Sequence, residues 1–293
     1  MSVYEKIEHK VVDMLANGIV PWHRPFDEDM LPRSHRTGEV YVGINRLLLS
    51  KGGEYWTFNQ VKDAGLRVKK GCHAETIYFY SRIGDDFYYA DYDDDGNICT
   101  KQQNSRFLLK GYNVFHEDDV VGLQSKSQNI DYDKNNVVLH EPQKIVNSYL
   151  SREDAPKLVI MDGVPCYAHG ESLLGSVDEI RMPAKYRFDS IESYYGTLFH
   201  EMVHSTGHKS RLDRKLGSGK ASFTYAREEF VAEMGSAALC SISGLSESLL
   251  DNSAAYCASW MDKIRSDIRA FVWAANKADV AVNYILTGSK TVR

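Results

Sequence analysis

The chain has 293 residues, of which 43% are hydrophobic and 26% are charged, and its formal net charge is −5. These values are ordinary for a globular protein and exclude a chain that is disordered throughout. A single hydrophobic core rarely serves so many residues, so two domains are expected. No apolar run approaches the roughly 18 residues of a membrane span, and the mild negative charge excludes a protein that is basic over its whole surface.

The N-terminus and the cysteines indicate the compartment. The first residues, MSVYEKIEHKVVDML, are charged and amphipathic, and they lack the apolar segment and cleavage site of a secretory signal. The five cysteines are scattered and form no C-x-x-C pair, which favours reduced thiols over disulfides or a thiolate zinc site. We therefore expect a cytoplasmic protein without membrane contacts.

The N-terminal part alternates helical and strand patterns. Apolar residues at helical spacing predict a helix over residues 3–17, and Gly18 with two prolines then ends it. A second, short helix is predicted to begin after Thr57 as its cap and to end near Gly65. The segments AETIYFYSR and DDFYYADY are predicted to be strands that pair with each other, DDDGN to be a turn, and LLKGYNVFHEDDV to be a further strand. This part of the chain is therefore expected to be α+β.

Charge is distributed unevenly along the same part. Residues 33–82 hold nine lysines and arginines against four acids, whereas residues 85–95 hold six acids and no base. A basic stretch followed by an acidic hairpin predicts a polarised surface.

The polar segment QSKSQNIDYDKNN, residues 124–136, contains few large apolar residues and marks the predicted domain boundary. We expect one domain over residues 1–125, a linker over 126–140 and a second domain over 141–293.

The second domain is expected to begin with a short helix over residues 142–150. Three strand candidates follow, KLVIMD, VPCYAH and DEIRMP, and they would form a small antiparallel or mixed sheet. Four long helices complete the domain, and they are predicted over residues 190–207, 225–242, 254–266 and 268–286. The predicted fold class is α+β in two domains.

One helix of the second domain carries the clearest chemical motif. Asp189 and Glu192 form a D-x-x-E capping box that predicts its start. His200 and His204 are four residues apart, which places both imidazoles on one face, where they can share a zinc ion. Glu201 lies beside the pair and would take the proton of a water activated there. H-E-x-x-H is typical of zinc metallopeptidases, and the alternative is a surface helix with solvated histidines.

Two histidines leave a catalytic zinc site short of a third protein ligand. The segment YAREEFVAEMGSAAL on the next helix offers carboxylates, and we predict Glu229 as the ligand and Glu233 as the residue that orients a histidine. Glu228, Glu233 and His208 remain alternatives for the third ligand. The small residues from Gly235 onward would let the two helices approach closely.

The strand DEIRMP, which contains Asp178, Glu179 and Arg181, has two interpretations of equal weight. It would border the cleft and pair with an extended peptide substrate, or its charged side chains would decorate an edge strand that faces solvent.

Tyrosine and tryptophan are dense in the N-terminal part, and several lie near basic residues. Aromatic rings stack with bases and cations contact phosphates, a combination that binds single-stranded nucleic acid. The candidate DNA-binding residues are Trp22, Arg24, Tyr41, Asn45, Arg46, Trp56, Arg67, Lys69 and Lys70. The alternative is that most of these aromatic rings belong to the core of the domain.

The chain resembles the ArdC antirestriction family over nearly its whole length. The resemblance lies, in this order, in the segments MLANGIVPWHRPF, VGINRLLL, FNQVKDAGLRVKKG, GYNVFH, YYGTLFHEMVHSTGHKSRLDR, YAREEFVAEMGSAAL and ADVAVNYILTG. It implies an N-terminal domain that binds single-stranded DNA and a C-terminal zincin-like metallopeptidase domain, carried by conjugative plasmids to protect incoming DNA from host restriction.

The resemblance also implies roles for single residues. It implies metal binding by His200 and His204, general-base catalysis by Glu201, a third ligand within EEFVAE, and DNA contacts at Trp22 and at the Asn45–Arg46 pair. The chain departs from the family pattern at KKGCHAETIYFY and in the acidic hairpin.

These observations predict a cytoplasmic protein of a bacterial host or conjugation recipient. It would bind single-stranded DNA and hydrolyse peptide bonds with a zinc ion, or with another divalent ion such as Mn²⁺, and its substrate would be a restriction enzyme or another DNA-bound protein. One alternative is a protein that only occludes restriction sites on single-stranded DNA and whose metal is structural. A second alternative is a general cytosolic peptidase whose first domain selects protein partners.

Overall fold

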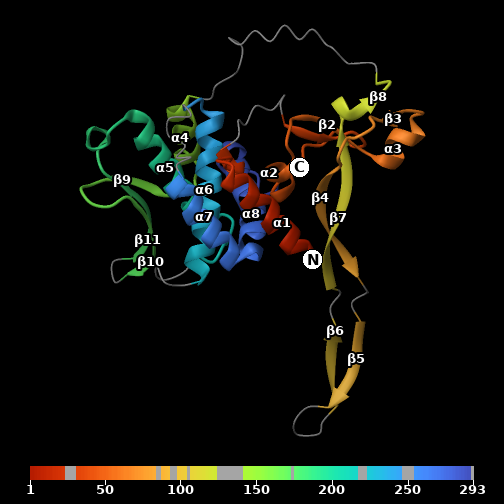
Figure 1. The fold of residues 1–293 in the computed structure, drawn as a ribbon. Helices are drawn as coiled ribbons and strands as arrows, with labels where there is room; N and C mark the ends of the chain where they lie inside the picture. The colour runs from red at the N-terminus through yellow and green to blue at the C-terminus, as the bar shows by residue number, and fades with distance from the viewer. Residues whose placement is uncertain are drawn as a thin grey trace.

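The computed structural model describes residues 1–23, 31–83, 87–92, 98–103, 106–123, 141–172, 175–216, 223–245 and 254–291. In these ranges the chain is α+β, with an N-terminal region built on a four-stranded mixed sheet and a C-terminal region of packed helices with a three-stranded mixed sheet (Figure 1). This confirms the predicted fold class. None of the described helices has both the length and the apolar character needed to cross a membrane.

The described N-terminal region has one main sheet and two separate two-stranded pairs, β3–β8 and β5–β6. Its elements are α1 (Val3–Ala16), η1 (Pro21–His23), β1 (Pro32–Ser34), α2 (Ile44–Leu48), β2 (Gly53–Thr57), α3 (Phe58–Asp63), β3 (Arg67–Val68), β4 (Glu75–Ile83), β5 (Phe87–Tyr92), β6 (Ile98–Gln103), β7 (Arg106–His116), η3 (Glu117–Asp119) and β8 (Val120–Val121). The main sheet has the order β1-β2-β7-β4, and the β5–β6 hairpin extends away from the helices in Figure 1.

The strand β4 does not pair with β5, so the expected pairing of these two segments is wrong. It forms an antiparallel ladder with β7, and β5 pairs with β6 instead. The physical reason is that β7 supplies buried residues for both faces of the ladder, with Leu109 on the face of Tyr78 and Val114 on the face of Ile77. The predicted DDDGN turn and the predicted linker, residues 126–140, lie outside the described residues.

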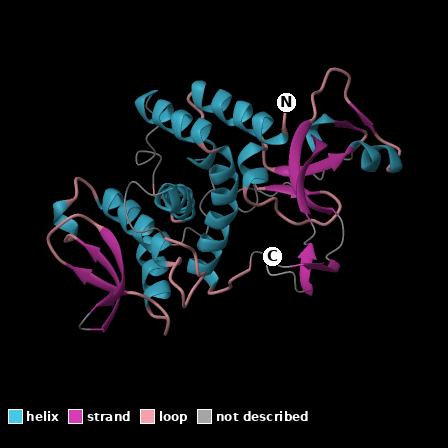
Figure 2. Cartoon of the chain, turned by 90° about the horizontal axis from the view of Figure 1, so that it is seen from below, coloured by secondary structure: helices cyan, strands magenta, loops and turns pink. Residues whose placement is uncertain are grey.

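The C-terminal region confirms the expected strands and helices to within a few residues. Its elements are α4 (Pro142–Leu150), β9 (Lys157–Ile160), β10 (Cys166–Ser172), β11 (Gly175–Met182), η4 (Lys185–Arg187), α5 (Ile191–Ser205), α6 (Phe223–Ile242), α7 (Ala254–Ser266) and α8 (Ile268–Thr287). Figure 2 shows the long helices between the two sheets.

The strand β11, which contains DEIRMP, is the central strand of its sheet rather than an edge. It pairs antiparallel with β10 and parallel with β9. Its Asp178 accepts hydrogen bonds from Arg211, whose guanidinium is fully buried and also contacts Tyr167. Both interpretations of this strand are therefore wrong, because each of its edges already has a partner and Asp178 anchors the sheet to the segment after α5.

The N-terminal cap of the helix α5 lies one residue later than expected. The Ser190 hydroxyl accepts a hydrogen bond from the Ser193 N–H at 3.0 Å, so Ser190 takes the place predicted for Asp189. The helix then crosses α6 at close range. A Cβ added to Gly235 would lie 2.8 Å from a methyl carbon of Val203, so this approach requires glycine at position 235.

The helix α1 packs with the C-terminal region, although it comes first in the chain. A capping box between Ser2 and Glu5 starts the helix. Its apolar stripe contacts α7 and α8, and Tyr78 and Leu109 of the main sheet join the same hydrophobic cluster. The buried residues of this stripe are Ile7, Val11, Met14 and Leu15. One hydrophobic core therefore connects the two regions.

A buried polar contact joins the regions beside this core. The Gly43 N–H donates to the Asp279 carboxylate, and Arg46 pairs with the same carboxylate at 2.6 Å. The φ angle of Gly43 is +59°, and a Cβ there would overlap the side chain of Asn276, so the close approach requires glycine. The side chains of Arg46 and Asp279 are only 12% and 5% exposed, so each charge depends on the other.

Replacing Asp279 with alanine should leave the buried Arg46 guanidinium without its counter-charge, which lowers the free energy of unfolding by about 3–5 kcal/mol. Urea denaturation followed by circular dichroism measures the loss. The control is Asp262→Ala on α7, where the side chain is 83% exposed, and it should change stability by less than about 0.5 kcal/mol. Equal free energies of unfolding in the two variants would show that this ion pair does not stabilise the fold.

Candidate functional site

The helices α5 and α6 bring two imidazoles and one carboxylate together. The Nε2 atoms of His200 and His204 lie 3.1 Å apart. The carboxylate oxygens of Glu229 lie 3.6 Å from Nε2 of His200 and 3.4 Å from Nε2 of His204. Among the described residues, these three form the group whose ligand atoms all lie within 4.8 Å of one another.

This spacing fits a divalent ion. Ligand atoms that lie about 2.0–2.1 Å from a tetrahedral ion are roughly 3.4 Å from each other. The three distances are of this size, although the two histidines approach different oxygens of Glu229. Two histidines and one glutamate are also the donor set of a class of catalytic metal sites that keep one position open. His200, His204 and Glu229, which the sequence predicts as ligands, are thus the residues that the fold brings together.

The carboxylate beside His204 on its other nitrogen belongs to Glu228. It lies 3.5 Å from Nδ1 of His204 and accepts a hydrogen bond from Arg214 at 3.0 Å. Arg214 in turn donates to the Val203 carbonyl and to the Thr206 hydroxyl at the end of α5. Glu228 therefore orients the imidazole, and the protein holds Glu228 itself in place.

The role predicted for Glu233 needs correction. Its carboxylate accepts a hydrogen bond from the Tyr256 hydroxyl. Among the described residues, no hydrogen bond or ion pair joins Glu233 to His200 or His204, and Glu233 is not in the group of candidate ligands. Glu233 shares a face of α6 with Glu229 but lies one turn further from the histidines, whereas Glu228 lies level with them. The spacing along α6 did not reveal this difference in height.

The electrostatics of the site favour a cation. Burial favours the neutral imidazole of His204, but hydrogen bonds to Glu228 and Glu229 outweigh it and raise the pKa of His204 to about 9. Although burial raises the pKa of Glu229, hydrogen bonds to both histidines hold it well below its usual range. Two ionised carboxylates thus face the imidazoles. A metal ion between these groups would supply the positive charge that a protonated histidine supplies without it.

Glu201 and Tyr225 border the same place. The Glu201 side chain is buried, with 8% exposure, and follows His200 directly on α5. Burial and a hydrogen bond to Glu229 raise the pKa of Tyr225 to about 12, so its phenol stays protonated. The alternative ligand His208 lies past the end of α5, where its Nδ1 bonds to the Ser210 hydroxyl at 2.8 Å.

Trp22, a candidate DNA-binding residue, is instead part of the core next to the site. It is 4% exposed, and its ring packs edge-on against Trp260 at 5.2 Å between ring centroids. Its indole N–H donates to the Tyr256 hydroxyl at 3.3 Å. The basic neighbours His23 and Arg24 favour a surface position for Trp22, but its ring packs against α7. Arg24 itself lies outside the described residues.

Asn45 and Arg46 are also buried rather than exposed to a nucleic acid. The Asn45 amide donates to the Tyr78 carbonyl at 2.9 Å and accepts from the Tyr78 N–H at 2.7 Å, which fixes α2 against β4. Arg46 is used by its ion pair with Asp279. The segment GINR therefore holds the two regions of the chain together.

Of the remaining candidate DNA-binding residues, the three basic ones are exposed and the two aromatic ones are buried. Arg67, Lys69 and Lys70 are exposed in and after β3, and the Lys69 ammonium donates to the Asp118 carbonyl. Tyr41 and Trp56 are 8% and 5% exposed, but both border a hollow on the N-terminal region.

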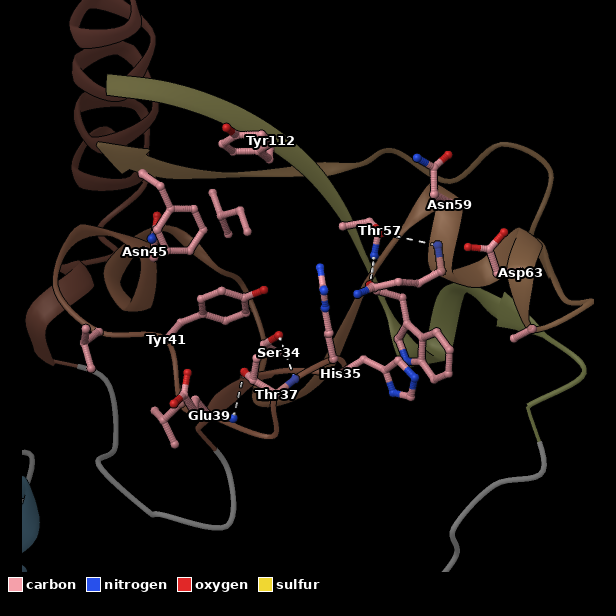
Figure 3. A pocket seen from close by; sticks show the side chains of 18 residues that line it. Ser34, His35, Thr37, Glu39, Tyr41, Asn45, Thr57, Asn59, Asp63 and Tyr112 are labelled. Atoms are coloured by element: carbon pink, nitrogen blue, oxygen red, sulfur yellow. Dashed lines mark hydrogen bonds between the residues drawn. The ribbon is translucent and has the colours of Figure 1, made fainter. Parts of the chain in front are cut away.

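This hollow has a volume of about 1140 Å³ and lies on the outer face of the main sheet (Figure 3). Phe79 and Tyr112 line it with exposures of 47% and 45%, and their ring centroids lie 6.3 Å apart. Tyr41 continues the aromatic row at 6.5 Å from Phe79. Lys110, which is exposed, is the cross-strand neighbour of Phe79. The indole N–H of Trp56 has no hydrogen-bond partner among the described residues.

Sequence reasoning did not place Phe79 or Lys110 in a site. Strand alternation puts Phe79 on the same face as the buried Ile77, but alternation does not show where the cover of a sheet ends. The pairing of β4 with β7 would have brought Phe79, Lys110 and Tyr112 together, and the predicted pairing was a different one.

Comparison with known proteins agrees with both regions. Residues 1–115 match the family described as the N-terminal domain of anti-restriction factor ArdC, and residues 171–277 match the zincin-like metallopeptidase family. A metal-free and a Mn(II)-bound crystal structure of the antirestriction protein ArdC from plasmid R388 are similar to the chain, with TM-scores of 0.63 and 0.65, 26% identity and 97% of each chain covered. The chain is an ArdC-type protein.

Two kinds of relatives are similar to the chain over 97% of its length. An uncharacterized protein of Sinorhizobium fredii, y4eC, is 28% identical over 299 residues, which covers 97% of this chain and 91% of the relative. A DNA primase TraC of Escherichia coli is 26% identical over 305 residues, which again covers 97% of this chain but 27% of the primase. A second primase TraC is 28% identical over 308 residues, and the chain spans 20% of its length.

The assignment of the ligands predicts which variants keep a metal ion. After incubation with Zn²⁺ or Mn²⁺ and desalting, the wild type should retain one equivalent per chain, and His204→Ala and Glu229→Ala should retain none. Glu233→Gln should retain the full equivalent, because its carboxylate faces Tyr256. Elemental analysis by mass spectrometry measures the content. Loss of the ion in Glu233→Gln with retention in Glu229→Ala would reverse the assignment.

Proposed function

We propose that this ArdC-type protein is a cytoplasmic, plasmid-type antirestriction protein that binds single-stranded DNA and hydrolyses peptide bonds. The DNA would be the strand that enters a recipient cell by conjugation, which the protein protects from host restriction. The observation that carries the peptidase part is the spacing of His200, His204 and Glu229, with Glu201 buried beside them. The similarity to antirestriction protein ArdC and to the zincin-like family supports the assignment.

The residues of the site divide the chemistry among them. A divalent ion, for which we propose zinc with Mn²⁺ as the alternative, would polarise a peptide carbonyl and activate water. The Glu201 carboxylate would accept a proton from the attacking water and pass it to the leaving amine. Glu228 and Arg214 would keep the His204 ring in one orientation during these steps. Tyr225, which stays protonated, would donate a hydrogen bond at the Glu229 side of the site.

Single-stranded DNA would bind over the hollow of the N-terminal region. Half-exposed rings at Phe79 and Tyr112 offer stacking surfaces to bases, and Lys110 offers a cation to phosphate. The exposed basic side chains of Arg67, Lys69 and Lys70 in the same region would extend the contact with the phosphate backbone of the DNA. Direct stacking needs no particular sequence, which suits a protein that protects DNA of any origin.

Among the described residues of the site, none distinguishes a restriction enzyme from other protein substrates. The alternative function follows from the position of the ligands, because an ion held by both α5 and α6 would brace the region. In that case DNA occlusion alone would protect, and the metal would be structural.

Glu201→Gln separates the two functions. The neutral amide has nearly the same shape and leaves the three ligands in place, so metal content and fold should be unchanged. Peptidase activity, measured with a fluorogenic peptide library, should fall on the order of 100-fold or more, because the general base is lost. Protection of transferred DNA is measured in the same variant by conjugation into a restricting host. Full protection of DNA by Glu201→Gln would show that protection does not require peptide hydrolysis. Full peptidase activity in this variant would show that Glu201 is not the general base.

Phe79→Ala should weaken single-stranded DNA binding by about 1–3 kcal/mol, because it removes one stacking surface. Fluorescence anisotropy with a labelled oligonucleotide over a salt series measures the affinity, which should fall as salt rises. The matched control is Phe58→Ala on α3, whose ring is 59% exposed and is not part of the hollow. Equal losses in both variants, or none in Phe79→Ala, would place the DNA elsewhere.

A further inference from the structure

A second cavity of about 360 Å³ lies directly beside the candidate metal centre. Its walls are one face of α5 and one face of α6, each defined by residues three and four apart. The wall residues used here are Ser193, Gly196 and Thr197 on α5 and Glu233, Ser236 and Ala237 on α6. His200 of the candidate metal centre also lines the cavity, as do His23 and Tyr256.

The cavity continues the two helix faces that hold the metal ligands. Glu233 is one turn beyond the ligand Glu229, and Thr197 is three residues before His200, so each wall lies about 5 Å along its helix from a ligand. An extended peptide advances about 3.3 Å per residue. A peptide held at the metal centre would therefore place the side chain of a residue next to the scissile bond into this cavity.

Most of the lining is small, and its charge comes from one carboxylate. The five wall residues other than Glu233 are glycine, alanine, serine and threonine, which leave room for a long side chain. Among the described residues that line the cavity, none is a lysine or an arginine. Glu233 is the only carboxylate among the described residues that line the cavity.

The Glu233 carboxylate is held in place from behind. Tyr256 donates a hydrogen bond to one of its oxygens, and the Trp22 indole supports the Tyr256 hydroxyl at 3.3 Å. Burial and the charge of Glu233 raise the pKa of Tyr256, so its hydroxyl remains a donor. A carboxylate fixed on a cavity wall gains most from a cationic ligand, since an apolar one would remove its water without replacing the hydrogen bonds.

We propose that this cavity binds the basic side chain, lysine or arginine, of the residue next to the scissile bond, and that Glu233 determines this specificity. The inference rests on the proposed peptidase function and names its substrate class, polypeptides cut beside a basic residue. Trp22 belongs to the N-terminal region, so the region proposed to bind DNA also supports the specificity residue.

The direct test uses two chelating probes, Nα-acetyl-arginine hydroxamate and Nα-acetyl-citrulline hydroxamate. The two side chains have nearly the same shape, but a neutral urea oxygen in citrulline replaces one donor nitrogen of the charged guanidinium in arginine. The hydroxamate binds the metal without being hydrolysed. Isothermal titration of the Mn²⁺-loaded full chain should give an affinity ratio of at least about tenfold in favour of arginine, as expected for a charge-assisted hydrogen bond.

Glu233→Gln should reduce that ratio to within about twofold, while the citrulline probe keeps its affinity, since the amide preserves the bond to Tyr256 but lacks the charge. The control Asp262→Asn removes a charge of the same sign from an 83% exposed site on α7 and should keep the full ratio. Circular dichroism melting confirms that the variants are folded. A wild-type ratio near one, an unchanged ratio in Glu233→Gln, or no binding of either probe by metal-loaded protein overturns the inference.

This readout does not depend on turnover. If the chain holds metal but cleaves no peptide, the peptidase proposal fails, and the ratio of the two probes still decides the specificity of the cavity. If the chain does cleave a peptide library, wild-type cuts should lie beside lysine or arginine, and Glu233→Gln should lose that preference. Cuts without this preference overturn the inference and leave the peptidase intact.

Discussion

The close crossing of α5 and α6 is the constraint on which the candidate site depends. Its two histidines lie on one helix and its carboxylate on the other, so no ligand set exists unless the helices approach closely. Gly235 permits this approach because the methyl groups of Val203 occupy the space of a side chain there. Arg214 then ties the end of α5 to Glu228 of α6. Packing and polar contacts thus set the distances that a metal ion requires.

Three glutamates of α6 lie at or next to the candidate site. Glu228 orients an imidazole, Glu229 faces both imidazoles, and Glu233, one turn later, faces the neighbouring cavity. The N-terminal region takes part through Trp22, which supports the last of these positions from behind. The first helix and the GINR segment also pack against α7 and α8, so the two regions share one hydrophobic core.

Features set by local spacing could be predicted from the sequence. The pair His200 and His204, one helical turn apart, and the cap at Thr57 depend only on residues within four positions of each other. The third ligand required the assumption that the next helix crosses the first, and Glu229 lies where that crossing puts it. The height of Glu233 relative to the histidines depends on where the helices cross, which no local pattern contains.

The surface of the N-terminal region was harder to predict. Basic neighbours made Trp22 and Arg46 resemble nucleic-acid contacts, but their partners, Tyr256 and Asp279, lie more than 200 positions away. Strand register posed the same difficulty, since Phe79 meets Tyr112 only because β4 pairs with β7. Aromatic density therefore indicated a binding surface, while the tertiary fold decided which rings remain exposed.

The central claim, one divalent ion held between α5 and α6, is tested most directly by anomalous diffraction at the absorption edge of Mn or Zn from crystals grown with that ion. We expect one strong peak within bonding distance of Nε2 of His200, Nε2 of His204 and a carboxylate oxygen of Glu229. A peak on other residues, or ordered histidine rings with no peak between them, would contradict the claim.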